Sequence, residues 1–138
     1  MTVMHRSEWR VARVQYKFTI PLKPITKKNS QQIIKDKTGR PRIIQSSAYR
    51  KYEKQCEPYM PHIDTIAHKV NVKSVYYMPN NRRVDLTNLH EALHDILVHY
   101  GVLVDDNSKI IVSTDGSYVD VDKWNPRTEV TITDLETG

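Results

Sequence analysis

An amphipathic pattern between residues 89 and 100 constrains the fold of this chain more than any other feature of its sequence. The apolar residues recur at i, i+3, i+4, i+7, i+8 and i+11, which is the spacing of one face of an α-helix. They are Leu89, Ala92, Leu93, Ile96, Leu97 and Tyr100. Gly101 follows at the position where a left-handed C-terminal cap is expected. A helix with one apolar face has to bury that face against another layer of structure.

Alternating apolar and polar residues predict strands on both sides of this helix. Before the helix the patterns cover residues 11–20 and 69–78. After the helix they cover residues 109–121 and 128–135, with a break around residues 123–126.

Two further elements are predicted between the first two strands. The pairs Ile33-Ile34 and Ile43-Ile44 flank turn-forming residues 37–40 within a polar stretch, residues 25–47, which predicts a hairpin with a basic tip. A second helix is predicted from Ser46 to about Tyr59, with Ser46 or Ser47 as its N-cap. The order β, β-hairpin, α, β, α, β, β lacks strict βα alternation. It predicts an α+β fold: a two-layer sandwich in which a mixed β-sheet carries two main helices on one face.

The distribution of charge suggests two different partners. The chain of 138 residues suits one domain, and we expect a basic N-terminal arm at residues 1–10 and a single domain at residues 11–138. Residues 1–60 hold fourteen Lys and Arg against four Asp and Glu, whereas residues 61–138 hold seven against twelve. This asymmetry suggests a polyanion on one side and a cation on the other. A basic face that meets only solvent is the simpler alternative.

Membrane insertion and export are not expected. The sequence has no run of about 18 apolar residues and no continuous hydrophobic segment near its N-terminus. A single cysteine, Cys56, cannot form an internal disulfide. We therefore expect a cytoplasmic protein with no membrane partner.

Two acidic segments flank the predicted helix, Asp85-Leu86-Thr87-Asn88 before it and Val104-Asp105-Asp106-Asn107 after it. A helix of about 13 residues is about 20 Å long, so the segments meet only if the chain doubles back after Gly101, for example as a strand through Leu103-Val104. Carboxylate oxygens without a thiolate suit Mg²⁺ or Mn²⁺. Taken singly, each segment has a simpler interpretation, either a helix N-cap with a capping box at Asn88 and Glu91 or an ordinary turn.

Together these residues carry a resemblance to a known family. The motifs are Tyr77-Met78-Pro79, Arg82-Arg83-x-Asp85-Leu86-x-Asn88-Leu89, Asp95-x-Leu97, Gly101 and Asp105-Asp106, preceded by Pro24-x-Thr26-Lys27-Lys28-Asn29-Ser30 and Ala48-Tyr49-Arg50. Over about residues 14–134 the chain resembles the RusA family of Holliday junction resolvases. The resemblance implies a homodimeric, Mg²⁺-dependent endodeoxyribonuclease that resolves four-way DNA junctions by paired, symmetric nicks. It implies no organic cofactor.

The resemblance also implies roles for single residues. Asp85 and Asp106 are the expected metal ligands, and Asp105 is a second ligand or orients water. Family members commonly have a third acid at position 87, where this chain has Thr87, which offers only a neutral oxygen. His90 could shuttle a proton or neutralise charge in the transition state, and a plain surface histidine is the alternative. The residues expected to bind DNA are Lys27, Lys28, Asn29, Arg40, Arg42, Arg50, Arg82 and Arg83.

Two alternatives remain open at this point. His90-Glu91-Ala92-Leu93-His94 matches the H-E-x-x-H pattern of zinc metalloproteases, in which two histidines one helical turn apart bind Zn²⁺. No downstream His or Glu stands out as a third ligand. Thr87 instead allows a branched-DNA-binding protein that has lost catalysis.

Overall fold

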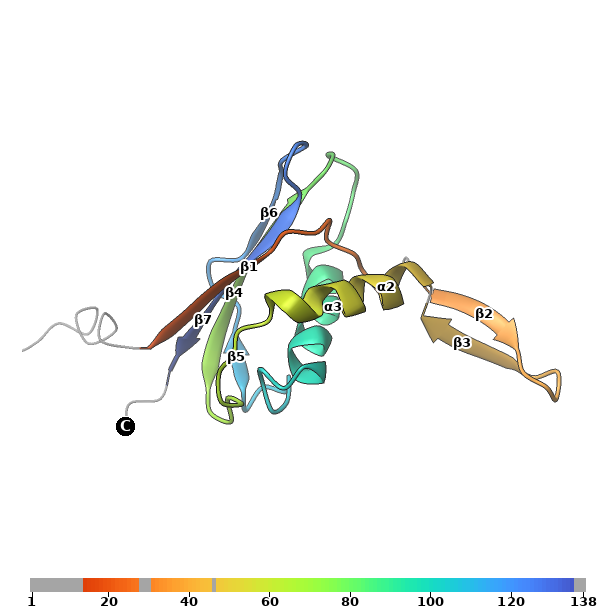
Figure 1. Ribbon diagram of the computed structural model, residues 1–138, viewed down its shortest axis with the longest axis horizontal. Coiled ribbons are helices and arrows are strands. Elements are labelled where there is room, and N and C mark those ends of the chain that lie inside the picture. The colour runs from red at the N-terminus through yellow and green to blue at the C-terminus, as the bar shows by residue number, and fades with distance from the viewer. Residues whose placement is uncertain (1–13, 28–30, 46, 136–138) are drawn as a thin grey trace, which may run out of the picture.

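One mixed sheet forms the centre of the fold in the computed structural model, which describes residues 14–27, 31–45 and 47–135 (Figure 1). The strands are β1 (Gln15–Ile20), β7 (Arg127–Asp134), β4 (Val70–Met78), β5 (Ile111–Ser113) and β6 (Tyr118–Val121). Strand β4 pairs antiparallel with β7 along one edge and parallel with β5 and β6 along the other, and β1 pairs antiparallel with β7. The predicted α+β class with a mixed sheet is confirmed.

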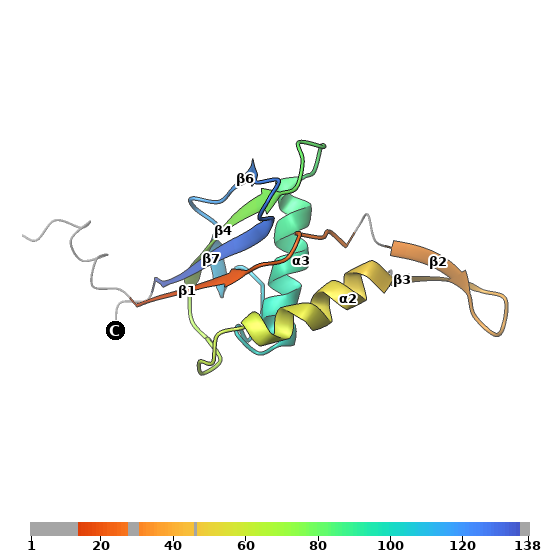
Figure 2. The same cartoon turned by 45° about the horizontal axis from the view of Figure 1, so that its top comes forward.

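Two α-helices lie on the same side of this sheet (Figure 2). They are α2 (Ser47–Cys56), extended by the 3₁₀ turn η2 (Glu57–Tyr59), and α3 (Leu86–His99). The apolar stripe that predicted α3 is the face that the structure buries, with Leu89, Ala92, Leu93, Ile96 and Leu97 all in the core. Helix α2 contributes Tyr52 and Cys56 to the same core. Burying such side chains stabilises a fold by roughly 1.5–3 kcal/mol each.

The ends of α3 follow from its flanking residues. The helix begins at Leu86, three residues before the apolar pattern, because Asp85 before it is extended (φ −90°, ψ 126°) and its carbonyl accepts from the Leu89 amide at 3.2 Å. At the other end Gly101 has φ +73°, a left-handed conformation that favours glycine. The predicted C-terminal cap is confirmed.

The prediction of a single strand over residues 109–121 is wrong. The structure has two short strands, β5 and β6, separated by a turn in which Gly116 has φ +87°. The turn is held by side chains rather than by continued ladder bonds. The Asn71 Oδ1 accepts from the Asp115 amide at 2.8 Å, and the Ser117 Oγ accepts from the Ser74 amide at 2.9 Å. Alternation alone did not reveal this break.

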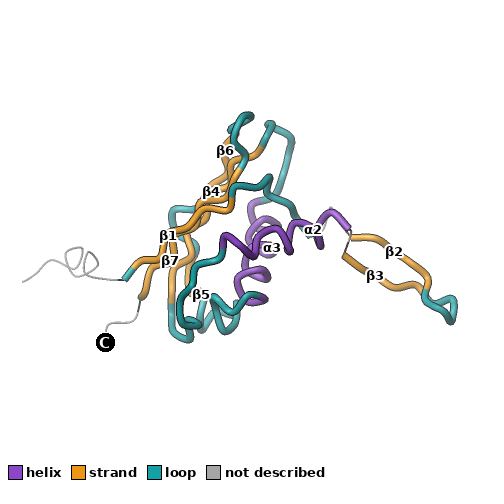
Figure 3. Tube along the Cα trace, in the orientation of Figure 1, coloured by secondary structure: helices purple, strands orange, loops and turns teal. Residues whose placement is uncertain are grey.

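The predicted hairpin is confirmed as β2 (Gln31–Lys35) and β3 (Pro41–Gln45), with Ile33 opposite Ile43. The Asp36 carboxylate accepts from the amides of Thr38 at 2.8 Å and Arg40 at 3.0 Å, which orders the turn. The hairpin forms a sheet of its own and projects away from the central sheet (Figure 3).

Several predictions fall outside the described residues. These are the basic arm at residues 1–10, the start of the strand predicted at residues 11–20, and Lys28, Asn29 and Ser46. Within the part that the structure describes, no helix is long and apolar enough to cross a membrane.

Candidate active site

Asp85 occupies the N-cap position of α3 but does not use its side chain as a cap. Its carboxylate makes no capping hydrogen bond to the first turn, and its contact is with the Asn88 Nδ2 at 3.4 Å. Asp85 is exposed, and so is Thr87 in the first turn of the helix. Asp85 therefore stands at the position of an N-cap, but its carboxylate does not act as one. The side chain is exposed to solvent and is available to a ligand.

The chain doubles back after α3, the condition set by the sequence for the two acidic segments to meet, and carries Asp106 to the side of the helix. The Ile66 amide donates to the Val102 carbonyl at 3.0 Å, and the Val104 amide donates to the Ile66 carbonyl at 2.9 Å. This segment makes an isolated parallel bridge between Ile66 and Leu103 rather than a regular strand. It leads directly to Asp105 and Asp106.

Asp106 lies beside two other carboxylates. We call Asp95, Asp105 and Asp106 the acidic cluster. Partial burial raises the pKa of Asp106, and hydrogen bonding to Asp105 and the charge of Asp95 raise it further. Asp95 in turn pairs with the Lys27 ammonium. Sequence reasoning placed Asp95 in a family motif and gave it no role, and its position on α3 did not reveal that the returning chain would reach it.

Asp85 lies outside this cluster. Asp85 precedes Asp95 by ten positions, which corresponds to about 15 Å along the helix axis at 1.5 Å per residue. Asn88 and Glu91 occupy the helix between them. In the described parts of the chain, no three His, Cys, Asp or Glu side chains are already arranged to hold one metal ion. A site shared by Asp85 and Asp106 therefore remains a proposal.

Asp105 has a defined local role. Its Oδ1 accepts from the Asp106 amide at 2.7 Å, and its Oδ2 accepts from the Asn107 Nδ2 at 3.1 Å. These bonds fix the turn that presents Asp106. The geometry favours orientation of Asp106 over direct metal binding by Asp105.

His90 is not a plain surface residue. Its Nδ1 is 2.8 Å from the Tyr76 hydroxyl, and its ring stacks on His94 with centroids 5.3 Å apart and planes 10° from parallel. Burial lowers the pKa of His90, which favours the neutral imidazole. The Nε2 atoms of both histidines are buried without a hydrogen-bond partner among the described residues. The zinc-site alternative would need a third ligand for this pair, and the described residues supply none.

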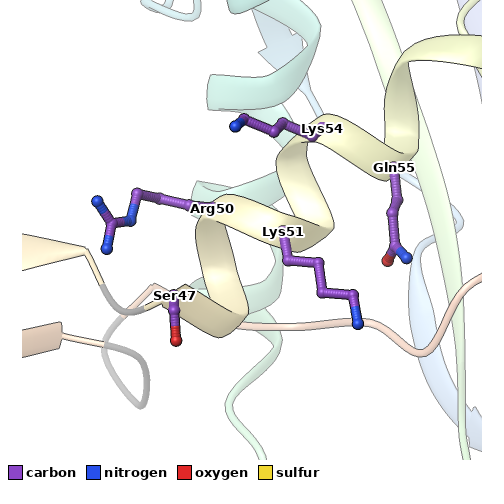
Figure 4. A pocket seen from close by; sticks show the side chains of 5 residues that line it. All are labelled: Ser47, Arg50, Lys51, Lys54 and Gln55. Atoms are coloured by element: carbon purple, nitrogen blue, oxygen red, sulfur yellow. The ribbon is translucent and has the colours of Figure 1, made fainter.

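Three cations form an exposed stripe on α2, which we call the α2 cationic face: Arg50, Lys51 and Lys54. With Ser47 and Gln55 they line a shallow surface hollow (Figure 4). None of the three forms an ion pair with a described residue, so their charges are uncompensated. Only Arg50 was predicted to bind DNA. Lys51 and Lys54 follow Arg50 by one and four residues on the predicted helix, and this spacing could have identified them as further DNA-binding candidates.

The other predicted DNA-binding residues lie in separate places. Arg82 and Arg83 are exposed in the loop before Asp85 and line a second hollow together with Lys23, which the sequence did not single out. Arg40 and Arg42 are exposed on the projecting hairpin. Lys27 faces Asp95.

The donor atoms fit a hard divalent cation. Asp85, Thr87, Asn88, Asp106 and Asn107 offer carboxylate, hydroxyl and amide oxygens, which suit Mg²⁺ and Mn²⁺. Burial and the neighbouring carboxylates raise the pKa of Asp106, and a cation there would offset the charge repulsion from Asp95. The residues therefore fit the chemistry of a metal-dependent nuclease.

Oxygen donors of this kind together with uncompensated cationic surfaces are typical of one class of proteins, the metal-dependent enzymes that cut nucleic-acid phosphodiesters. A family comparison makes the assignment specific, because the family described as "Endodeoxyribonuclease RusA" matches residues 21–133. The chain belongs to the RusA family, and the resemblance seen in the sequence is confirmed. It is an endodeoxyribonuclease of the kind that resolves Holliday junctions, it acts on branched DNA, and it depends on a divalent metal. A comparison with individually curated proteins finds no match.

Proposed function

We propose that this chain acts as a homodimer in the cytoplasm and uses Mg²⁺ to introduce paired, symmetric nicks into four-way DNA junctions. The observation that carries the proposal is the environment of Asp106 in a chain of this family. A carboxylate held against Asp95 and Asp105, with a raised pKa, is suited to binding a divalent cation. Mn²⁺ is expected to substitute for Mg²⁺.

Asp85 and Asp106 are the proposed metal ligands, and Thr87 contributes a neutral oxygen directly or through water. The bound ion would polarise the scissile phosphate and stabilise the charge that develops on the leaving oxygen. Asp105 holds the turn that aims Asp106. Because Asp85 and Asp95 are about three helical turns apart, a shared site requires the Asp106 carboxylate to reach from beside Asp95 toward the start of α3.

His90 is the proposed proton carrier of the site. Its lowered pKa keeps the ring neutral, so it can accept a proton and is poorly suited to neutralising negative charge. The Tyr76 hydroxyl at its Nδ1 fixes the orientation of the ring. His90 lies on α3 one turn beyond Asp85 and Leu86.

The cationic surfaces are the proposed contacts with the DNA backbone. Arg82 and Arg83 would hold the phosphates next to the cut, because they lie two and three residues before Asp85. The α2 cationic face, Arg40, Arg42, Lys27, Lys28 and Asn29 would hold the arms. A four-way junction has two-fold symmetry, which suits an isologous dimer that presents one site to each of two equivalent strands.

The deciding experiment compares wild type with Asp106→Asn on an end-labelled four-way junction, with Mg²⁺ or with EDTA. We expect both proteins to bind and only wild type with Mg²⁺ to cut. Thr87 supports one rival function, binding without catalysis. Wild type that binds the junction and does not cut it in Mg²⁺ or Mn²⁺ would establish that rival.

A further inference from the structure

Trp124, in the turn between β6 and β7, is presented almost completely to solvent. Its side chain is 87% exposed, more than the other exposed large hydrophobic residues of the described chain. An indole is the largest apolar side chain and ordinarily gains stability by packing. Here the ring lies beside a cation instead, since the Lys123 ammonium is 5.0 Å from its centroid. The core of the protein makes no use of Trp124.

The turn that carries Trp124 is rigidly built. The Asp122 Oδ1 accepts from the amides of Trp124 at 3.2 Å and Asn125 at 3.1 Å, and its Oδ2 accepts from the Arg127 guanidinium at 2.8 Å. Arg127 also donates to Glu129 at 2.8 Å and stacks 3.8 Å from the centre of the Tyr77 ring. An exposed aromatic on an ordered support loses little conformational freedom when a ligand stacks on it.

This turn leaves the sheet at the same end as the loop that leads to Asp85. Strands β4 and β6 run parallel with Met78 opposite Val121, and the Asp122 amide donates to the Met78 carbonyl at 2.9 Å. The chain continues from Met78 into the loop of Arg82 and Arg83, while from Val121 it continues into the Trp124 turn. Both loops are found at one end of the sheet (Figure 1). DNA held by Arg82 and Arg83 would therefore lie at the end of the sheet that also carries Trp124.

We propose that Trp124 stacks on an unpaired nucleobase at the branch point of the junction, with Lys123 on the adjoining phosphate. The inference rests on the proposed junction-cutting function and names a residue that selects branched over linear DNA. Every base has a π-face, and aromatic side chains combined with cations are the usual means of holding unpaired bases. Trp is also enriched at protein interfaces, but Lys is depleted from their centres, so the Lys123 ammonium beside the indole favours a polyanion over a protein.

The test uses a four-way junction with 2-aminopurine at the branch point and the matching linear duplex, both with EDTA so that nothing is cut. The proteins carry Trp9→Phe, so that Trp124 is the remaining tryptophan. Trp124→Ala should weaken junction binding by about 5- to 100-fold, leave duplex binding unchanged, and remove the change in 2-aminopurine fluorescence. Trp124→Phe, which can still stack, should recover most of the affinity and of the signal.

Three results would overturn the inference. The Trp124→Ala protein could bind the junction as tightly as the protein that retains Trp124. The substitution could also weaken junction binding and duplex binding equally. It could also change the oligomeric state in sedimentation, which would assign the indole to a subunit interface. Failure of the proposed function is separate, because then the protein with Trp124 intact would itself show no preference for the junction over the duplex.

Discussion

The ammonium of Lys27 lies against the carboxylate of Asp95, and this pair joins the segment after β1 to the middle of α3 beside Asp106. Lys27 was predicted to bind DNA, and the structure gives it a protein partner within the acidic cluster. Both side chains are partly exposed, at 22% and 36%, so screening by water and salt reduces the strength of the pair.

We predict that Lys27→Met and Asp95→Asn are coupled. In a double-mutant cycle measured by urea unfolding at low salt, the coupling should be about 0.5–1 kcal/mol. It should shrink when salt is added, because salt screens charges that water reaches. If the change in unfolding free energy of the double variant equals the sum of the two single changes, the pair contributes nothing to the stability of the fold.

The α2 cationic face should govern the salt dependence of junction binding. Replacing Arg50, Lys51 and Lys54 by Ala together should reduce the slope of log affinity against log salt by about 0.9 for each phosphate that the protein no longer neutralises. Lys17→Ala is the matched control, because Lys17 is exposed on β1, on the sheet face turned away from the helices. A triple variant with the slope of wild type would remove this face from the DNA-binding surface.

His94 should make the protein less stable in acid. Burial and the neighbouring His90 lower the pKa of His94 to about 4, below its ordinary value of 6.5. Between these values the unfolded chain binds a proton that the folded chain does not, so stability falls as pH drops through this window. The loss is of order 2–3 kcal/mol.

Unfolding at pH 7 and pH 4 would measure the effect. His94→Gln should be less sensitive to acid than wild type over this interval, whatever its stability at pH 7. His62→Gln, at an exposed histidine in the loop before β4, should behave like wild type. Identical pH dependence in His94→Gln and wild type would contradict the prediction.

Cys56 should report on global unfolding. Its side chain is 0% exposed, and burial raises the pKa of the thiol to about 12, so the reactive thiolate is suppressed in the folded protein. A thiol reagent at pH 8 should therefore react only after urea is added. In a Cys56→Ser background, S47C on the exposed face of α2 should react at once, and rapid reaction of native Cys56 would contradict the packing of α2.

The parts of the fold that were predictable are those determined by local chemistry. The period of α3, its stop at Gly101, and the hairpin around Asp36 and Gly39 all depend on residues adjacent in the chain. The split between β5 and β6 depends on Asn71, more than forty residues away in β4. Within residues 109–121 the turn-forming pair Asp115-Gly116 marks the break, and alternation alone passes over it.

The site divides in the same way. Asp85 and Asp106 became candidate ligands through residue type and the family resemblance, and that role stays a prediction, whereas the contact of Asp106 with Asp95 depends on the bridge between Ile66 and Leu103 that directs the returning chain. The stacking of His90 on His94 is local, because the two lie one helical turn apart on α3, and their spacing was visible in the sequence. The contact of His90 with Tyr76 of β4 joins two separate elements and leaves no local signature.

The central claim is that Asp85 and Asp106 serve one metal site, and a rate comparison tests it most directly. Junction cleavage in Mg²⁺ is measured for Asp85→Asn, Asp106→Asn and the double variant, with junction affinity measured in parallel. Residues that act as a unit are non-additive, so each single variant should lose activity to within about tenfold of the double variant while still binding the junction. A single variant that cuts at the wild-type rate, or a double variant whose loss is the product of the two single losses, would contradict a shared site.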